Sequence, residues 1–360
     1  MQNGLEPASV TIRDVARAAG VSITTVSHVL SGHRPTGELT RHRVLAVVEQ
    51  LNYRPNRVAQ SLATRHTRTV GLILPDILNP FFPQLVHAIE RSAIHAGYRL
   101  LLCHTDSLES LERECLEDLV ARRVEGVIYM RGTAAPNPVL ERLAEEHFPL
   151  VVLDEEVPGL VAPGVYAMNR LGGRMAARHL WQLGHRDVGV IGGPRGLVSV
   201  CDRVQGFQET YRRLGAPVPE ERTVFTGFSV HGGQEAGRGL LLRHPELTAV
   251  FAANDLIAFG VIQAARELGR SVPGSLSVLG FDDVTTAAMV DPPLTTVRQP
   301  IRRMGSEAFR LLMGQVRGTW EPVRRQLPTR LVERGSTAPP ERVRAVSAAG
   351  GATPPRSPGA

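Results

Sequence analysis

Apolar residues recur at helical spacing in the first part of the chain. In the run VTIRDVARAAGVSITTVSHVL, residues 10–30, Thr11 stands at an N-cap position and Gly20 at the end of a first short helix. Ser22 can cap a second helix, and Thr40 can cap a third. Two short helices joined by a turn that contains glycine are typical of a helix-turn-helix, so this pattern predicts a small all-helical unit.

From residue 69 onward, apolar strands alternate with amphipathic helices. Residues 70–75, VGLILP, are apolar without polar alternation, as in a parallel sheet that is covered on both faces. The pattern predicts further strands at 99–103, 126–130, 150–153, 188–191, 249–252 and 276–280. It predicts helices at 80–97, 108–123, 139–147, 171–183, 203–214, 232–243 and 257–268. This βαβ rhythm predicts an α/β fold with two doubly wound parallel sheets and a ligand crevice at the carboxyl ends of their strands.

The same patterns divide the chain into four parts. We expect a helix-turn-helix headpiece at 1–54, a hinge helix and linker at 55–68, a two-lobed core at 69–335 and a tail at 336–360. The hinge helix begins after a proline and is too short to be stable in isolation. The tail is rich in Pro, Gly, Ala and Ser, a composition that predicts disorder.

The net charge of +6 is concentrated at the two ends of the chain, and all 41 basic residues are arginine. Residues 1–68 hold nine arginines against four acidic residues, and residues 334–360 hold four against one. Residues 69–333 hold 28 arginines against 30 acidic residues. A basic N-terminal unit indicates a polyanionic partner. The nearly neutral segment 69–333 gives no such indication.

Several classes of protein are disfavoured by what the sequence lacks. The GGPRG segment at 192–196 fits neither phosphate-loop template, and HExxH, CxxC and GxSxG patterns are missing. No lysine is available for Schiff-base or phosphate-loop chemistry. We therefore expect no enzymatic activity, no metal site and no cofactor.

The sequence also indicates the cellular compartment in which the protein resides. The three cysteines, Cys103, Cys115 and Cys201, are an odd number in a long chain, which indicates a reducing, cytosolic setting. No apolar run approaches the ~20 residues that span a bilayer. The N-terminus has no apolar segment typical of a secretory signal, so we expect a cytoplasmic protein.

The N-terminal residues carry a resemblance to a known family. TIRDVARAAGVSITTVSHVLSG and ELTRHRVLAVVEQLNYRPNRVAQSLA resemble, without gaps, the DNA-binding headpiece of the LacI/GalR (lactose-repressor) family of bacterial transcription regulators. The resemblance continues through the core. It implies a homodimer on pseudo-palindromic double-stranded operator DNA and a core like a periplasmic sugar-binding protein. The implied N-lobe covers about 69–167 and 298–325, and the implied C-lobe covers about 168–297 and 326–335.

The resemblance assigns roles to residues of the headpiece and hinge. Three residues match base-reading positions: Ile23, Thr24 and His28. Three match phosphate-contacting positions: Thr25, Ser27 and Asn56. In the hinge helix, three residues match positions that pack in the minor groove, where the leucine wedges into the central base step: Val58, Ala59 and Leu62. The spacing alone leaves a helical hairpin without a DNA role as an alternative.

Polar side chains follow the expected strands of the core, where the crevice should lie. They are Asp76, Asp154, Asn254, Asp255, Asp282 and Asp283, and Arg203 is expected to begin a helix after an irregular loop at 192–202. Carboxylate, amide and guanidinium groups beside aromatic rings suit hydroxyl-rich ligands. A strand-end Asn254 or Asp255 could equally serve only as a helix N-cap.

By family position, eight residues line the effector pocket: Phe81, Phe82, Asp154, Arg203, Phe228, Asn254, Asp282 and Gln299. The resemblance implies that Arg203, Asn254 and Asp282 grip sugar hydroxyls, so a sugar or sugar derivative is the expected effector. A nucleoside or purine effector is the alternative, disfavoured by Leu197 and Ser199 where purine-responsive members carry a basic residue and a hydroxyl. A sugar-binding protein without a DNA function is the remaining alternative.

Overall fold

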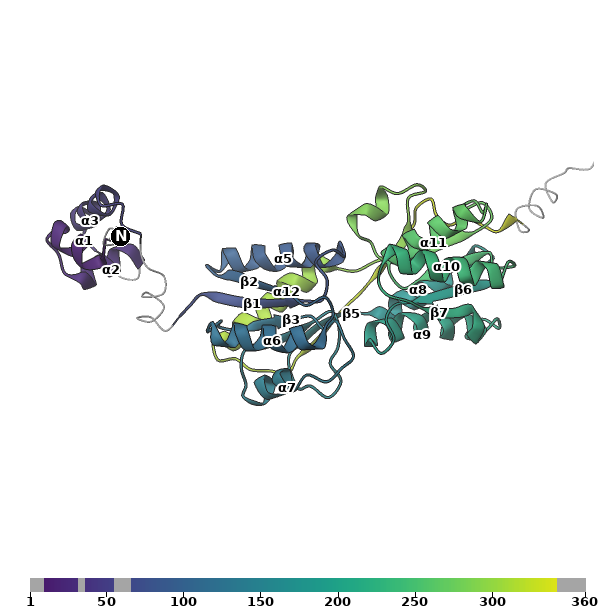
Figure 1. Cartoon of the computed structure of the whole chain (residues 1–360), viewed down its shortest axis with the longest axis horizontal. Coiled ribbons are helices and arrows are strands. Elements are labelled where there is room, and N and C mark those ends of the chain that lie inside the picture. Colours follow the sequence, from purple (N-terminus) through teal and green to yellow (C-terminus); the bar gives the residue numbers. More distant parts are fainter. Residues whose placement is uncertain (1–9, 32–35, 55–65, 342–360) are drawn as a thin grey trace, which may run out of the picture. The chain divides into compact units, whose positions relative to one another are not determined.

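The computed structural model describes residues 10–31, 36–54 and 66–341, and the chain forms two units that divide at Thr67 and Arg68 (Figure 1). The N-terminal unit contains three helices: α1 (Ile12–Ala19), α2 (Ile23–Ser31) and α3 (Glu38–Gln50). Each contributes fully buried valines to one small core, which includes Val15, Val26 and Val44.

The ends of the first two helices are fixed by the residues that the sequence indicates. Thr11 is the N-cap of α1, and the carboxylate of Asp14 accepts hydrogen bonds from Thr11 N at 3.0 Å and Thr11 Oγ1 at 2.6 Å. Gly20 ends α1 with φ of 63°, a conformation that glycine adopts without a steric penalty. At the start of α2, Ser22 Oγ accepts a hydrogen bond from Thr25 N at 3.0 Å.

The start of α3 corrects a prediction. The N-cap of α3 is Gly37, not Thr40, which lies in the first turn of the helix. The helix extends farther toward the N-terminus because Glu38 stands in its first turn, where an acidic side chain is favoured by the positive end of the helix.

The first lobe of the core, the N-lobe, is built on a six-stranded sheet in which all strands are parallel, in the order β11-β5-β4-β3-β1-β2. Its strands are β1 (Thr69–Leu74), β2 (Arg99–His104), β3 (Val127–Tyr129), β4 (Leu150–Leu153), β5 (Gly164–Ala167) and β11 (Arg324–Leu327). Four helices pack on it: α5 (Phe81–His95), α6 (Glu109–Ala121), α7 (Pro138–Glu145) and α12 (Ile301–Val316). Helices α5 and α12 cover one face and α6 and α7 the other (Figure 1).

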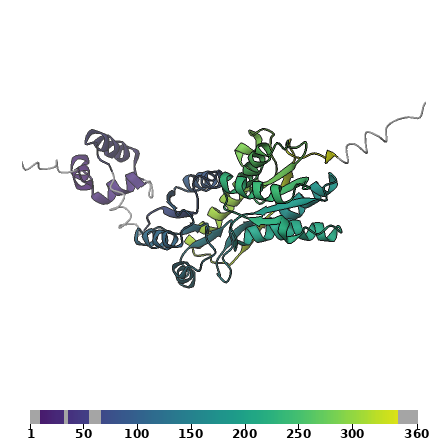
Figure 2. The same cartoon turned by 45° about the vertical axis from the view of Figure 1, so that its right-hand side comes forward.

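The second lobe, the C-lobe, repeats this plan around the order β12-β10-β9-β8-β6-β7. Its strands are β6 (Val188–Gly192), β7 (Thr223–Phe225), β8 (Ala249–Ala252), β9 (Ser277–Asp282), β10 (Thr295–Arg298) and β12 (Arg330–Val332). Helices α8 (Asn169–Gln182) and α9 (Val198–Arg213) cover one face, and α10 (Val230–Arg243) and α11 (Asp255–Glu267) cover the other (Figure 2). Short 3-10 helices lie at Glu220–Arg222 and Thr285–Ala288. Only β12 among the described strands of this sheet is antiparallel to its neighbour.

The chain passes between the lobes three times. It leaves the N-lobe after β5, returns between β10 and α12, and crosses again between β11 and β12. Strands β5 and β10, which directly precede the first two crossovers, were not predicted, and neither were helix α12 and the edge strands β7, β11 and β12. Edge strands of three or four residues with polar sequences, such as RRQL in β11, carry no apolar run to mark them.

Two boundaries differ from the sequence-based predictions. Helix α9 begins at Val198, so Arg203 lies within the helix and not at its start. The segment after residue 335 also begins as ordered chain: Ser336 is fully buried, and its Oγ donates to Val278 O at 2.6 Å. Ala338 N donates to Ser277 Oγ at 3.0 Å. The predicted disorder is therefore wrong for the start of the tail, because its small polar residues complete the hydrogen bonding of the second sheet; residues 342–360 lie outside the described residues.

Candidate effector and DNA-binding sites

A cavity of about 280 Å³ lies between the two lobes of the core. The structure brings all eight predicted effector residues together in its wall: Phe81, Phe82, Asp154, Arg203, Phe228, Asn254, Asp282 and Gln299. They come from the carboxyl ends of strands and from the helices that follow, which is where doubly wound sheets bind ligands.

Arg203 is the centre of the polar wall. Its side chain projects from α9, is only 3% exposed, and lies over the ring of Phe281 at 4.0 Å from the ring centroid. Its Nε donates to Asn169 Oδ1 at 2.8 Å, and its Nη1 donates to Ala253 O at 2.8 Å and to Asp282 Oδ1 at 3.3 Å. A guanidinium held by this many partners has a fixed orientation toward the cavity.

Asp282 ends β9 with a φ of 113°. Its Oδ1 accepts a hydrogen bond from Gln299 Nε2 at 2.8 Å as well as from Arg203. Burial raises the pKa of Asp282 to about 7, although the charge of Arg203 lowers it.

Asn254 serves as a helix cap and as part of the wall. It is the N-cap of α11, and its side chain accepts a hydrogen bond from Ile257 N at 2.9 Å. The capping interpretation left open by the sequence therefore holds for Asn254, which nevertheless also lines the cavity. Its neighbour Asp255 points elsewhere: it accepts hydrogen bonds from Thr296 Oγ1 and Val284 N inside the C-lobe.

Two buried acceptor atoms in the wall have no hydrogen-bond partner, Asp154 Oδ1 and Gln299 Oε1. Burial raises the pKa of Asp154 to about 7, and the charge of Arg203 opposes this rise. Buried polar atoms without partners cost free energy, so both atoms favour a ligand that donates hydrogen bonds, such as a sugar hydroxyl.

Aromatic side chains form the apolar side of the cavity. Phe81 and Phe82 stand in the first turn of α5 with ring centroids 5.2 Å apart in an edge-to-face arrangement. Phe228 precedes α10 and faces the same cavity. Such rings can pack against the C–H face of a sugar ring or against a planar base.

Several polar residues of this wall were not predicted, among them Arg131 and Glu155. Arg131 follows β3, so the strand-end pattern could have found it. Its Nη2 donates to Ala135 O at 2.9 Å, which holds the loop after β3.

The two remaining strand-end aspartates differ in their positions. Asp76 lines the cavity, whereas Asp283 pairs with Arg298 and Arg334 within the C-lobe.

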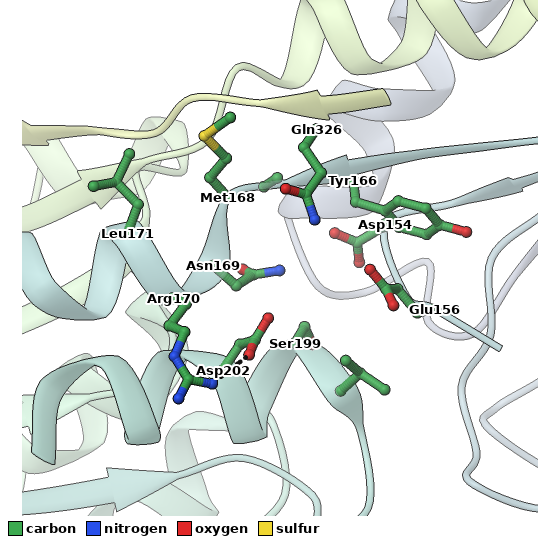
Figure 3. Close-up of a pocket in the computed structure, with 12 residues that line it drawn as sticks. Asp154, Glu156, Tyr166, Met168, Asn169, Arg170, Leu171, Ser199, Asp202 and Gln326 are labelled. Atoms are coloured by element: carbon green, nitrogen blue, oxygen red, sulfur yellow. Dashed lines mark hydrogen bonds and ion pairs between the residues drawn. The ribbon is translucent and has the colours of Figure 1, made fainter. Parts of the chain in front are cut away.

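A second cavity, of about 170 Å³, lies next to the first and shares Asp154 and Ser199 with it (Figure 3). Side chains of the first crossover, including Tyr166 and Asn169, line it together with Gln326 of β11. Asp202 contributes a carboxylate that pairs with Arg170 at 3.4 Å (Figure 3). The Asp154 side chain thus stands between the two cavities.

In the N-terminal unit, α2 displays most of the predicted DNA-contacting residues at its surface. Ile23, Thr24 and Ser27 are exposed, and Thr25 and His28 are partly buried. The Thr25 hydroxyl lies 2.8 Å from Ser22 Oγ, so it also takes part in the helix cap. The predicted phosphate contact Asn56 and the hinge residues Val58, Ala59 and Leu62 lie outside the described residues.

Within residues 10–31, 36–54 and 66–341, no group of three or more His, Cys, Asp or Glu side chains is placed to hold a metal ion. No described helix is both long and apolar enough to cross a membrane.

Comparison with known families gives matches at both ends of the chain. The family described as "Bacterial regulatory proteins, lacI family" matches residues 11–56. The family described as "Periplasmic binding protein-like domain" matches residues 177–337. The first match covers the three helices of the N-terminal unit, and the second covers most of the C-lobe.

Individual relatives cover nearly the whole chain. The HTH-type transcriptional regulator DegA of Bacillus subtilis is 38% identical over 332 residues, 91% of this chain and 98% of the relative. The ribose operon repressor of Halalkalibacterium halodurans is 37% identical over 91% of this chain and 97% of the relative. The transcriptional repressor PurR of Proteus mirabilis is also 37% identical, over 91% of this chain and 97% of its own length. Among solved structures, a lac repressor dimer bound to operator and an anti-inducer superposes with a TM-score of 0.82 at 28% identity, covering 92% of this chain and 99% of that chain.

Proposed function

Because the chain belongs to the lacI family of bacterial regulatory proteins, we propose that it is a repressor whose operator binding is controlled by a sugar or sugar derivative held between its two lobes. The family consists of transcriptional regulators and not of enzymes. The repressor acts in the cytoplasm as a homodimer, and its two headpieces contact the halves of a pseudo-palindromic operator.

One observation favours a hydroxyl-rich effector above all. The cavity presents a fixed guanidinium, Arg203, beside two acceptor atoms without partners, Asp154 Oδ1 and Gln299 Oε1. A sugar hydroxyl can both accept from a guanidinium and donate to a carboxylate, so a ring with adjacent hydroxyls satisfies all three groups. The phenylalanines on the apolar side suit the other face of such a ring.

A purine effector is the second candidate, since a PurR protein is among the relatives. The aromatic rings would accept a planar base. Two features argue against it: Leu197 contributes an apolar side chain to the wall, and the hydroxyl of Ser199 is already bonded to Glu155. A base would therefore find few free partners in this part of the cavity.

For DNA recognition, the N-terminal turns of α2 would enter the major groove. Ile23, Thr24 and His28 would contact base edges there, and an imidazole can donate to guanine N7 or O6. Thr25, Ser27 and Asn56 would contact phosphates. In the hinge segment, Val58 and Ala59 would pack against the partner's hinge helix in the minor groove, with Leu62 inserted between base pairs.

A gel-shift experiment tests this function directly. Full-length protein should shift a palindromic fragment from the region upstream of its own gene, and His28→Ala should lose roughly 1–3 kcal/mol at one base pair in each half-site. Ribose, cellobiose and hypoxanthine, screened by thermal shift and then added to the gel, test the effector class. Absence of any sequence-specific shift would contradict the repressor, and a response to hypoxanthine alone would contradict the sugar effector.

A further inference from the structure

The carboxylate of Glu155 joins the two lobes through residues that lie outside the crossover segments. Glu155 follows β4 in the N-lobe and is 3% exposed. It accepts hydrogen bonds from the backbone N–H groups of Val198 and Ser199 and from Ser199 Oγ, all in the first turn of α9 in the C-lobe. Among the described residues, the other hydrogen bonds between the lobes lie in the crossover segments, such as Met168 N to Leu327 O at 2.9 Å.

Helix α9 depends on this carboxylate for its cap. The N-cap residue of α9 is Leu197, whose side chain has no oxygen and makes no capping hydrogen bond. The first N–H groups of a helix lack partners within the helix and carry partial positive charge, so a carboxylate is their best partner. Glu155 supplies this cap from the opposite lobe.

The loop before α9 touches the N-lobe on the same side. Gly196 has a φ of 90°, and a Cβ placed on it would lie 2.9 Å from the Cβ of Ala134 in the loop after β3. The backbone of the C-lobe therefore approaches the N-lobe as closely as glycine permits. The cap and this contact together hold the start of α9 against the N-lobe.

The position of α9 determines the shape of the effector cavity. Ser199 and Arg203 lie one turn apart on α9, and both line the cavity opposite Asp154, which directly precedes Glu155 in the chain. A shift of α9 relative to the N-lobe would therefore change the separation between Arg203 and Asp154.

We propose that Glu155 is a positioning residue that caps α9 across the cleft and thereby holds the two lobes closed around the effector cavity. Burial of the carboxylate costs free energy that the hydrogen bonds at α9 offset, so the net preference for closure is small enough for an effector to change it. The effect of lobe closure on operator binding rests on the proposed function, because closure changes operator binding only if the core binds an effector.

Disulfide trapping measures lobe closure without DNA or sugar. Ala134→Cys and Arg195→Cys place two exposed thiols on the two loops that meet across the cleft at Gly196, which itself stays glycine, in a full-length chain that carries Cys201→Ser to remove an exposed competitor. The rate of disulfide formation reports how often the lobes are closed. We expect Glu155→Gln to slow trapping roughly tenfold, because it removes charge-assisted hydrogen bonds. Glu156→Gln is the matched control, since the neighbouring carboxylate pairs with Arg324 within the N-lobe, and it should trap at the unmodified rate.

A second variant, Ser199→Ala, and a double-mutant cycle with Glu155→Gln distinguish loss of the helix cap from a general loss of structure. Ser199→Ala removes one of the donors and should slow trapping about threefold, and its effect should not add to that of Glu155→Gln. Melting curves followed by circular dichroism establish that each variant is folded; if Glu155→Gln does not fold, Ser199→Ala carries the test alone. An unchanged trapping rate in the folded variants, or equal slowing by Glu156→Gln, would overturn the proposal. A failed gel shift would overturn only the repressor function, since trapping uses no operator.

Discussion

At the scale of single residues, the backbone of Asp154 explains how one strand end supplies two carboxylates to the cleft. Its φ of 71° turns the chain after β4, so that Asp154 lines the effector cavity while Glu155 reaches α9. Asp282 has a φ of 113° at the end of β9. Aspartate tolerates positive φ better than most residues, so a short acidic side chain suits both the conformation and the chemistry of these positions.

The charge of Asp154 is expected to cost stability. Its pKa is about 7 in the folded chain against about 4 when exposed, so the folded state disfavours the ionised form. The contribution of protonated Asp154 to the free energy of unfolding is therefore fully present below pH 4. It is lost as the pH rises from 4 through 7. We expect Asp154→Asn to raise the melting temperature by roughly 4 °C at pH 8 and by much less at pH 4.5.

Thermal unfolding of the two proteins at both pH values checks this prediction. The wild-type chain at pH 4.5 is the internal control, because Asp154 is then mostly protonated. An equal gain at both pH values would show that packing, and not charge, separates aspartate from asparagine at this position.

At the scale of elements, the sequence-based prediction succeeded for strands β1 to β4, β6, β8 and β9 and for the helices before α12. It missed α12, the inner strands β5 and β10, and the edge strands β7, β11 and β12. The apolar run of β1 and the capped helices α1 and α2 follow from local patterns alone. Strands β7, β11 and β12 were missed because short edge strands bury few side chains. Helix α9 was placed to begin five residues late, because its first residues have no capping side chain of their own.

The cavity residues were predictable and the cap was not. All eight lie at strand ends or helix starts, or match family positions, so topology and resemblance bring them together. Glu155 was overlooked because its role depends on a contact between lobes, which no local pattern along the chain records.

The proposed hinge helix, which lies outside the described residues, leads to a test at this scale. Leu62→Ala should weaken operator binding and reduce the bend in the DNA, because alanine is too short to hold a base step open. A circular-permutation gel assay measures the bend, and Gln60→Ala, in the same segment but at a position with no assigned DNA contact, is the control that keeps the wedge. An unchanged bend with Leu62→Ala would rule out insertion of this side chain.

At the scale of the whole molecule, charge and chemistry are divided between the two units. The basic residues of 1–68 suit a polyanion, while the core places its charged groups in a cavity between lobes. Control of one site by the other requires that the effector favour one arrangement of the core. Residues that hold the effector can then be changed without altering the DNA-contacting surface.

Asp282→Asn should abolish the response to the sugar while leaving operator affinity within a few-fold. The substitution keeps the shape of the side chain but removes the charge that faces Arg203. Fluorescence anisotropy of labelled operator, with and without the sugar that shifts the melting temperature, measures both quantities. Arg195→Ala, outside the cavity wall, is the control, and a parallel loss of operator binding in Asp282→Asn would indicate damage to the fold.

The three crossovers also dictate the order in which the lobes can be completed on the ribosome. The first sheet begins at Thr69 but receives its covering helix α12 and its edge strand β11 only after residues 301–327 have been synthesised. Until then the face that α12 covers, including Val151 and Leu153 of β4, stays apolar and unprotected. The nascent N-lobe is thus exposed to aggregation while the C-lobe is being made, and we expect a demand for chaperones during translation that a chain with two uninterrupted lobes would not have.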